Sequence, residues 1–142
     1  PAVCSTHRRI EVLMEIKKHD IPTVAWLTPF LPYINDSEDN LRGLLGYCAE
    51  AGVKGIICFG IGVTLRDGNR EYFYSALDRH FQGLSDRYRR EYGLSYEIVS
   101  PNHGRLMRIF DDFCEKYDIM RNRECFEYLG ELPEKYQQLT LF

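Results

Sequence analysis

Apolar residues in the first half of the chain recur with helical spacing in two segments. The first follows the capping candidates Ser5 and Thr6 and predicts a helix over Thr6–Lys18, whose basic last turn suits the negative end of the helix dipole. The second carries one apolar stripe and predicts a helix over Glu38–Ala51, with Gly52 as its C-terminal stop. Both helices are therefore predicted to bury one face and expose the other.

Continuous apolar runs separate these helices. Thr23–Thr28 and Val53–Gly60 are rich in β-forming residues and lack the alternation of an edge strand, so each predicts a buried strand of a parallel sheet. Strands that alternate with helices indicate parallel β/α units, and the predicted fold class is therefore α/β. Two parallel strands do not complete a sheet, so we expect the C-terminal half of a β/α assembly whose first strands lie upstream.

The second half of the chain is predicted to be mainly helical. At most one further short strand is expected, near Tyr96–Val99, and Asp118–Asn122 is expected to be a connecting loop. We accordingly expect residues 1–65 to form the last β/α units and residues 66–142 to form a helical extension of the same domain. The predicted helices span Glu71–Phe81, Ser85–Tyr92, Gly104–Tyr117 and Glu124–Leu129.

Composition and charge narrow the class of protein. The 142 residues are 44% hydrophobic and 27% charged, which is typical of one ordinary globular domain, and no apolar stretch is long enough to span a membrane. A net charge of −3 excludes a whole-chain attraction to nucleic acid. The sequence around Arg87, Arg89 and Arg90 mixes cations with Tyr88 and Tyr92, which is typical either of a single-strand binder or of a solvated helix face.

The cysteines and histidines predict no metal site. Five cysteines occur without C-x-x-C spacing, and the four histidines lie on four separate elements. We expect reduced, buried thiols in a cytoplasmic protein, because Cys48, Cys58 and Cys114 lie among apolar neighbours in the predicted helices and strand. The expectation also takes account of the lack of a recognisable signal or transit peptide. The cysteines are Cys4, Cys48, Cys58, Cys114 and Cys125.

Two segments that follow the predicted strands are candidates for ligand binding, because ligands of parallel β/α folds bind at the carboxyl ends of the strands. Gly60 and Gly62 allow either a plain turn or the close approach of a ligand, while Leu65 replaces the third glycine of a dinucleotide fingerprint. The other segment is Trp26–Asp36, which ends at the start of the second predicted helix. Its Asn35 and Asp36 either offer polar side chains at the mouth of a binding site, or Asp36 serves only as the cap of that helix.

Several runs of the sequence resemble the second half of radical S-adenosylmethionine proteins of the spore photoproduct lyase-like group, often labelled DNA repair photolyases. That group has a partial (β/α)6 barrel and a C-x-x-x-C-x-x-C loop that holds a [4Fe-4S] cluster. The resemblance implies that the two predicted strands are the fifth and sixth of the barrel. The matching runs are Val3–Thr6, Arg9–Leu13, Ile21–Asp36, Gly55–Gly60, Thr64–Arg66, Gly68–Tyr74, Ser100–Asn102 and Arg105–Met107.

The resemblance also implies roles for individual residues. Contacts to S-adenosylmethionine are expected from Pro29, Leu31, Asn35, Asp36, Gly60 and Gly62. Contacts to the substrate are expected from Arg66, Asn69 and Tyr72. None of the cysteines has the spacing of the cluster loop, so this chain alone is expected to bind no cluster and to need the upstream half of the barrel.

The end of the chain carries a second resemblance. Gln138–Phe142 is similar to the Q-L-[SD]-L-F pentapeptide by which bacterial DNA-processing proteins bind the sliding clamp of DNA polymerase. Leu141 and Phe142 would be the apolar anchors and Gln138 would supply hydrogen bonds. The alternatives are a segment folded onto its own barrel, or a non-catalytic interaction module that binds DNA or the clamp.

Overall fold

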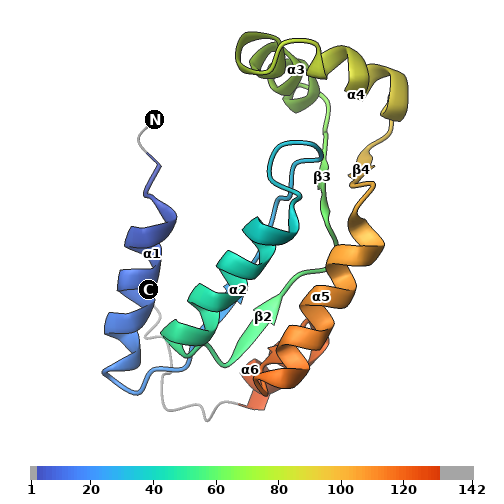
Figure 1. Cartoon of the computed structure of the whole chain (residues 1–142). Helices are drawn as coiled ribbons and strands as arrows, with labels where there is room; N and C mark the ends of the chain where they lie inside the picture. Colours follow the sequence, from blue (N-terminus) through green and yellow to red (C-terminus); the bar gives the residue numbers. More distant parts are fainter. Residues whose placement is uncertain (1–2, 132–142) are drawn as a thin grey trace, which may run out of the picture. The chain divides into compact units, whose positions relative to one another are not determined.

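The computed structural model describes residues 3–131, which form six helices and five short strands (Figure 1). The mixed α/β class predicted from the sequence is confirmed. The strands of this part form two small sheets and no closed barrel. No helix within it has the length and apolar character needed to cross a membrane. Contacts group the described residues into two units: unit 1 contains residues 3–27, 42–59 and 110–131, and unit 2 contains residues 28–41 and 60–109.

Unit 1 contains a three-stranded parallel sheet. The strands are β1 (Val24–Trp26), β2 (Gly55–Ile57) and β5 (Met120–Arg121), in the order β1-β2-β5. Ala25 lies opposite Ile56, and Ile56 lies opposite Arg121. The predicted parallel pairing of the first two strands is confirmed, but β1 is an edge strand among the described residues and not the buried strand that its sequence predicted.

Four helices contribute residues to unit 1. The first helix matches its predicted start because the Ser5 hydroxyl oxygen accepts a hydrogen bond from the Arg8 N–H at 3.2 Å. Two of the four, α2 and α5, also contribute residues to unit 2. The helices are α1 (Thr6–Lys17), α2 (Glu38–Ala51), α5 (His103–Lys116) and α6 (Arg123–Glu131).

Buried thiols form part of the core of unit 1. Cys48, Cys58, Cys114 and Cys125 are buried and unbridged, together with aliphatic residues such as Ile56. Burial raises the pKa of Cys48 to about 11, and burial is also the largest cause that raises the pKa of Cys114, to about 12. The prediction of free, buried thiols is therefore confirmed, whereas Cys4 is exposed.

Unit 2 combines an antiparallel strand pair with two further helices. Strand β3 (Gly62–Thr64) pairs with β4 (Glu97–Val99), and Val63 lies opposite Ile98. Helices α3 (Asn69–His80) and α4 (Leu84–Tyr92) connect these two strands in the sequence.

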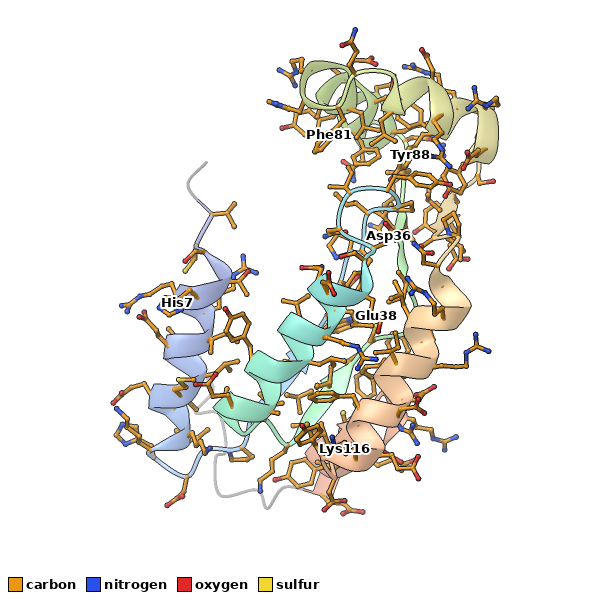
Figure 2. All side chains as sticks on the ribbon, in the orientation of Figure 1. His7, Asp36, Glu38, Phe81, Tyr88 and Lys116 are labelled. Atoms are coloured by element: carbon orange, nitrogen blue, oxygen red, sulfur yellow. The ribbon has the colours of Figure 1, made fainter. Side chains whose placement is uncertain are left out.

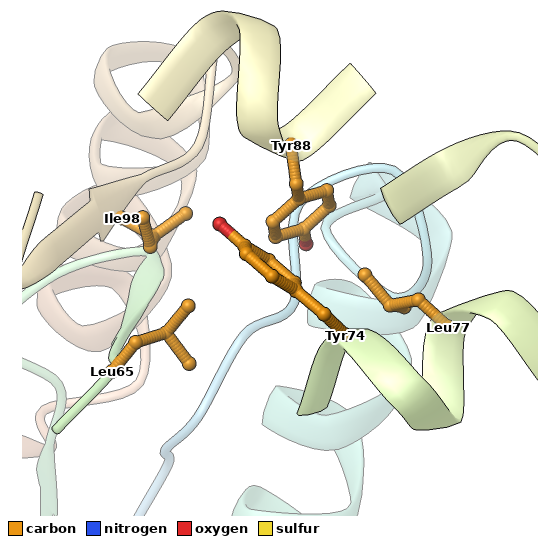
Figure 3. Packing of buried hydrophobic residues seen from close by; sticks show 5 residues of the cluster. All are labelled: Leu65, Tyr74, Leu77, Tyr88 and Ile98. Atoms are coloured by element: carbon orange, nitrogen blue, oxygen red, sulfur yellow. The ribbon is translucent and has the colours of Figure 1, made fainter. Parts of the chain in front are cut away.

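A cluster of buried side chains fills the space between these elements (Figure 3). It consists of Leu65, Tyr74, Leu77, Tyr88 and Ile98. The ring of Tyr88 is fully buried and lies edge-on to the ring of Tyr74, at a centroid distance of 6.3 Å. One face of α4 therefore belongs to the core of unit 2.

The buried guanidinium of Arg70 connects α3 to the end of α4. It donates hydrogen bonds to the carbonyl oxygens of Gly93 at 3.3 Å, Leu94 at 3.0 Å and Ser95 at 2.9 Å. A fourth bond reaches the carbonyl of Leu65 at 3.2 Å. Four carbonyl dipoles thus solvate a buried cation and satisfy the backbone where α4 ends.

The structure corrects two sequence-based expectations about strands. Gly62 was expected in a loop but begins β3, and Met120–Arg121 form β5 inside the expected connection Asp118–Asn122. A Cβ atom at Gly62 would collide with the carbonyl oxygen of Ile98 in the partner strand. This close approach of the two strands accounts for the glycine without a ligand.

We predict that one of the five cysteines reacts rapidly with a thiol reagent such as 5,5′-dithiobis(2-nitrobenzoate) at neutral pH. Cys4 is exposed, whereas the raised pKa of Cys48 lowers its thiolate fraction by about a hundredfold before burial hinders access. Cys4→Ser should abolish the fast phase, and denaturant should release the remaining thiols. A fast phase of two or more thiols in the native chain would contradict this arrangement.

We further predict that Arg70→Met lowers the free energy of unfolding by about 2–4 kcal/mol, because it leaves several buried carbonyls without donors. Arg70→Lys should recover part of the loss. The exposed Arg79 bonds the Ser75 carbonyl of its own helix, so Arg79→Ala is the matched control and should change stability by less than about 0.5 kcal/mol. Urea denaturation measures all three, and equal stability of the Arg70→Met and Arg79→Ala variants would refute the role of Arg70.

Candidate functional site

The candidate site is built around the buried carboxylate of Asp36, at the end of the loop that follows β1 (Figure 2). Asp36 is only 5% exposed. Its Oδ1 accepts a hydrogen bond from the Tyr33 N–H at 2.7 Å, and its Oδ2 accepts one from the Ser100 hydroxyl. The amide of Asn102 donates to the same Oδ2 at 3.4 Å. Three neutral donors therefore compensate the loss of water around this charge.

The turn at residues 100–102 is itself fixed by the same network. The Asn102 N–H donates to the Ser100 hydroxyl oxygen at 2.9 Å, and the Asn102 side-chain amide donates to the Asp36 carbonyl at 3.2 Å. Arg105 adds an ion pair with Glu38 at 2.9 Å, close to the start of α2. Loop 28–36 and the start of α5 are thus held together by several independent bonds.

Asp36 does not cap α2, because Ser37 does so: its hydroxyl oxygen accepts a hydrogen bond from the Asn40 N–H at 3.2 Å. The side-chain oxygen of Asn35 accepts from the Leu31 N–H, and the Asn35 carbonyl accepts from the Asn40 amide at 2.8 Å. The polar atoms of Asn35 and Asp36 therefore shape the loop. A ligand at this loop would meet its backbone and apolar side chains such as those of Pro29 and Leu31.

The structure brings loop 28–36 together with the two candidate glycines. The Phe30 N–H donates to the Gly62 carbonyl at 3.1 Å. The Ile61 N–H donates to Nδ1 of His103 at 3.2 Å, so the imidazole accepts there and a neutral ring carries its proton on Nε2. A Cβ atom at Gly60 would lie 3.2 Å from the His103 ring. Two segments from different parts of the sequence thus meet at one place in unit 2.

The expected substrate residues lie just before α3, in the case of Arg66, and in its first turn, in the case of Asn69 and Tyr72. Arg66 and Asn69 are exposed, and Tyr72 is 72% exposed. The Arg66 carbonyl accepts from the Arg70 N–H at 3.0 Å. Nothing in the Asp36 network involves these three side chains.

The Arg87–Tyr92 segment does not form the surface for stacking on nucleic-acid bases that its sequence had left open. Tyr88 is fully buried and donates a hydrogen bond to the Pro32 carbonyl at 2.7 Å. The Arg87 guanidinium lies 3.6 Å from the centroid of the Tyr33 ring and pairs with Glu91 at 2.8 Å. These contacts join α4 to loop 28–36, so Tyr88 is not available to stack on a nucleic-acid base.

Hydrogen bonds and burial shift the pKa values of three side chains in and next to this segment. Hydrogen bonds from the Tyr33 hydroxyl and from Arg87 lower the pKa of the Glu91 carboxyl. Burial is the largest cause that raises the pKa of Tyr33, followed by its hydrogen bond to Glu91. Burial also raises the pKa of Tyr88. These shifts favour the neutral phenols of Tyr33 and Tyr88 and the charged carboxylate of Glu91.

The functional partners that sequence reasoning missed are Ser100, Asn102 and His103. Ser100–Asn102 was singled out only as a run that matches the family resemblance, and no local signal connects it to a carboxylate 64 residues earlier. Among residues 3–131, no group of three histidine, cysteine or acidic side chains could hold a metal ion. Gln138, Leu141 and Phe142 lie outside the described residues.

Comparison with known proteins identifies relatives of part of the chain. It is similar to an uncharacterized protein of Mycobacterium bovis and to one of Mycobacterium tuberculosis. Each is 33% identical over 100 residues, which cover 70% of this chain and 28% of the relative. The chain therefore spans about 28% of the length of the curated relatives that it matches. No protein-family model matches the chain, and no solved structure matches it.

We predict that Asp36→Ala lowers the free energy of unfolding by about 2–4 kcal/mol, because the Tyr33 N–H and the Ser100 hydroxyl lose their acceptor. Asp36→Asn should cost less, since an amide oxygen still accepts one of these bonds. Asp112 lies exposed on α5, and Asp112→Asn should change stability by less than about 0.5 kcal/mol. Chemical denaturation tests this, with hydrogen exchange at the Tyr33 amide as a local readout. Wild-type stability and Tyr33 protection in Asp36→Ala would show that the network is dispensable.

Proposed function

We propose that this chain is the C-terminal portion of a radical S-adenosylmethionine protein of the spore photoproduct lyase-like group. It would form one wall of the cofactor and substrate cleft. The observation that carries this proposal is that the chain segments which follow the adjacent parallel strands β1 and β2 in the sequence are joined within unit 2, where the Phe30 N–H donates to the carbonyl of Gly62, the first residue of β3. Ligands of open parallel sheets bind beyond the carboxyl ends of such strands.

A free sheet edge supports the same proposal. Among residues 3–131, no strand pairs with β1 on the side away from β2. An unpaired edge strand accepts further strands, and a partial (β/α)6 barrel would supply them before β1. The relatives of this chain extend well beyond the aligned residues, which is compatible with such additional units.

The proposal assigns the iron–sulfur cluster to the part of the protein that precedes this chain. Among the described residues, no three histidine, cysteine or acidic side chains are grouped so that they could hold a metal ion, and these residues therefore do not fit a [4Fe-4S] cluster. In the complete enzyme, the cluster and S-adenosylmethionine would together supply a 5′-deoxyadenosyl radical. We expect this chain alone to be inactive.

The chain's own residues would bind and orient the cofactor and the substrate. The Asp36 network would hold loop 28–36 in one conformation, so that Pro29 and Leu31 present an apolar surface. His103 would fix the backbone at Gly60 through its bond to Ile61. Arg66, Asn69 and Tyr72 are exposed and would be free to contact the substrate.

Anaerobic iron–sulfur reconstitution of this chain, beside a protein extended upstream to include the cluster loop, tests the proposal. We expect absorbance at about 400 nm and formation of 5′-deoxyadenosine with the extended protein alone, because three thiolates ligate the cluster. In the extended protein, Asp36→Ala should reduce product formation about tenfold or more, since a displaced loop misplaces the bound cofactor. Arg123→Ala, at an exposed position of α6, is the matched control.

Two other outcomes of this experiment would contradict the proposal. A cluster on this chain alone would contradict the assignment of the ligands. Product from neither protein would exclude the enzyme and favour the interaction module, which binding of DNA or of the sliding clamp would then test.

A further inference from the structure

We infer that His103 donates a hydrogen bond from its Nε2–H to an uncharged acceptor in the nucleoside part of S-adenosylmethionine. The inference rests on the proposed function, because the ligand is the cofactor of that proposal. It adds a binding residue to the contacts that the resemblance implies, since His103 is not among them. The acceptor would be a ring nitrogen of adenine or a hydroxyl of ribose.

The backbone of Ile61 sets the tautomer of His103. The Ile61 N–H donates to Nδ1 of His103 at 3.2 Å, and Ile61 is only 1% exposed. A buried N–H that loses its acceptor costs free energy, so the structure favours a ring whose Nδ1 carries no proton. A neutral imidazole of this kind carries its proton on Nε2 and is a donor there.

The position of this ring is fixed from two sides. The His103 N–H donates to the Ser100 carbonyl at 3.0 Å, and the Ser100 hydroxyl donates to the Asp36 carboxylate. A Cβ atom at Gly60 would lie 3.2 Å from Cε1 and 3.6 Å from Nδ1 of the ring. Because Cε1 is bonded to Nε2, the donor lies near a residue that has no side chain to hinder a ligand.

The Nε2–H of His103 is an unused donor. The residue is partly exposed, and no described residue accepts a hydrogen bond from this N–H. The side-chain oxygens of Asn35 and Asp36, in contrast, already accept hydrogen bonds from backbone N–H groups of their own loop. His103 is therefore better placed to bond a ligand than the two polar residues selected from the sequence.

The bond to Ile61 also selects the kind of acceptor. A carboxylate beside Nε2 would favour the charged imidazolium. An imidazolium donates from both of its nitrogens, so it could not accept from the Ile61 N–H. The carboxylate of the methionine part is therefore disfavoured as the partner of His103, and the uncharged acceptors of the nucleoside part remain.

Ligand binding to the protein extended upstream to include the cluster loop tests the inference. The probes are S-adenosylhomocysteine and 5′-methylthioadenosine, which lacks the amino-acid part. His103→Asn keeps an oxygen near the position of Nδ1 but removes the Nε2–H. It should weaken binding of both probes about fivefold or more, as expected for the loss of one hydrogen bond, and should keep slow hydrogen exchange at the Ile61 amide. Anaerobic isothermal titration calorimetry measures the affinities.

Two variants are the controls. His103→Ala also removes the acceptor, so it should accelerate exchange at the Ile61 amide as well as weaken binding. His80→Asn makes the same substitution at an exposed position of α3 and should leave binding unchanged.

Failure of this inference can be distinguished from failure of the proposed function. If the unsubstituted extended protein binds neither probe, S-adenosylmethionine is not its ligand and both proposals are wrong. If that protein binds, but His103→Asn binds equally well or loses affinity only for S-adenosylhomocysteine, the role assigned to His103 is wrong and the proposed function stands. Fast exchange at the Ile61 amide in His103→Asn would also contradict the inference, because weaker binding would then follow from a displaced turn.

Discussion

A carboxylate can be buried only where hydrogen bonds replace the water that it loses, and Asp36 imposes this constraint on unit 2. Its donors come from Tyr33 in its own loop and from Ser100 and Asn102, about half the chain away. Satisfying the carboxylate therefore fixes loop 28–36 against the start of α5. The candidate site depends on this constraint, because the same loop bonds to Gly62 through Phe30.

The local elements of the fold could be predicted from the sequence because their signals are local. Ser5, the apolar stripe of α2 and Gly52 define helix ends and faces without reference to the rest of the chain. The strands β3 and β5 were not predicted, since no continuous apolar run marks them and each is defined by pairing with a strand distant in the sequence, β4 and β2 respectively.

In the candidate site, too, the features that depend on neighbouring residues could be predicted from the sequence, and those that depend on distant residues could not. Sequence reasoning selected Asp36 but considered only a cap or a ligand contact, because the role of its side chain is set by Ser100. Tyr88 is a different case, since a signal was present: Ser85, Tyr88 and Tyr92 recur at spacings of three and four and mark the inner face of α4. The prediction instead gave weight to the neighbouring arginines Arg87, Arg89 and Arg90, which suggested an exposed surface.

The two units use aromatic side chains in opposite ways. In unit 2, Tyr88 is buried, its hydroxyl bonded to a carbonyl, so its ring contributes to folding. In unit 1, Trp26, Phe59 and Phe126 contact one another but stay about half exposed, so these residues contribute less apolar burial to folding than Tyr88 does.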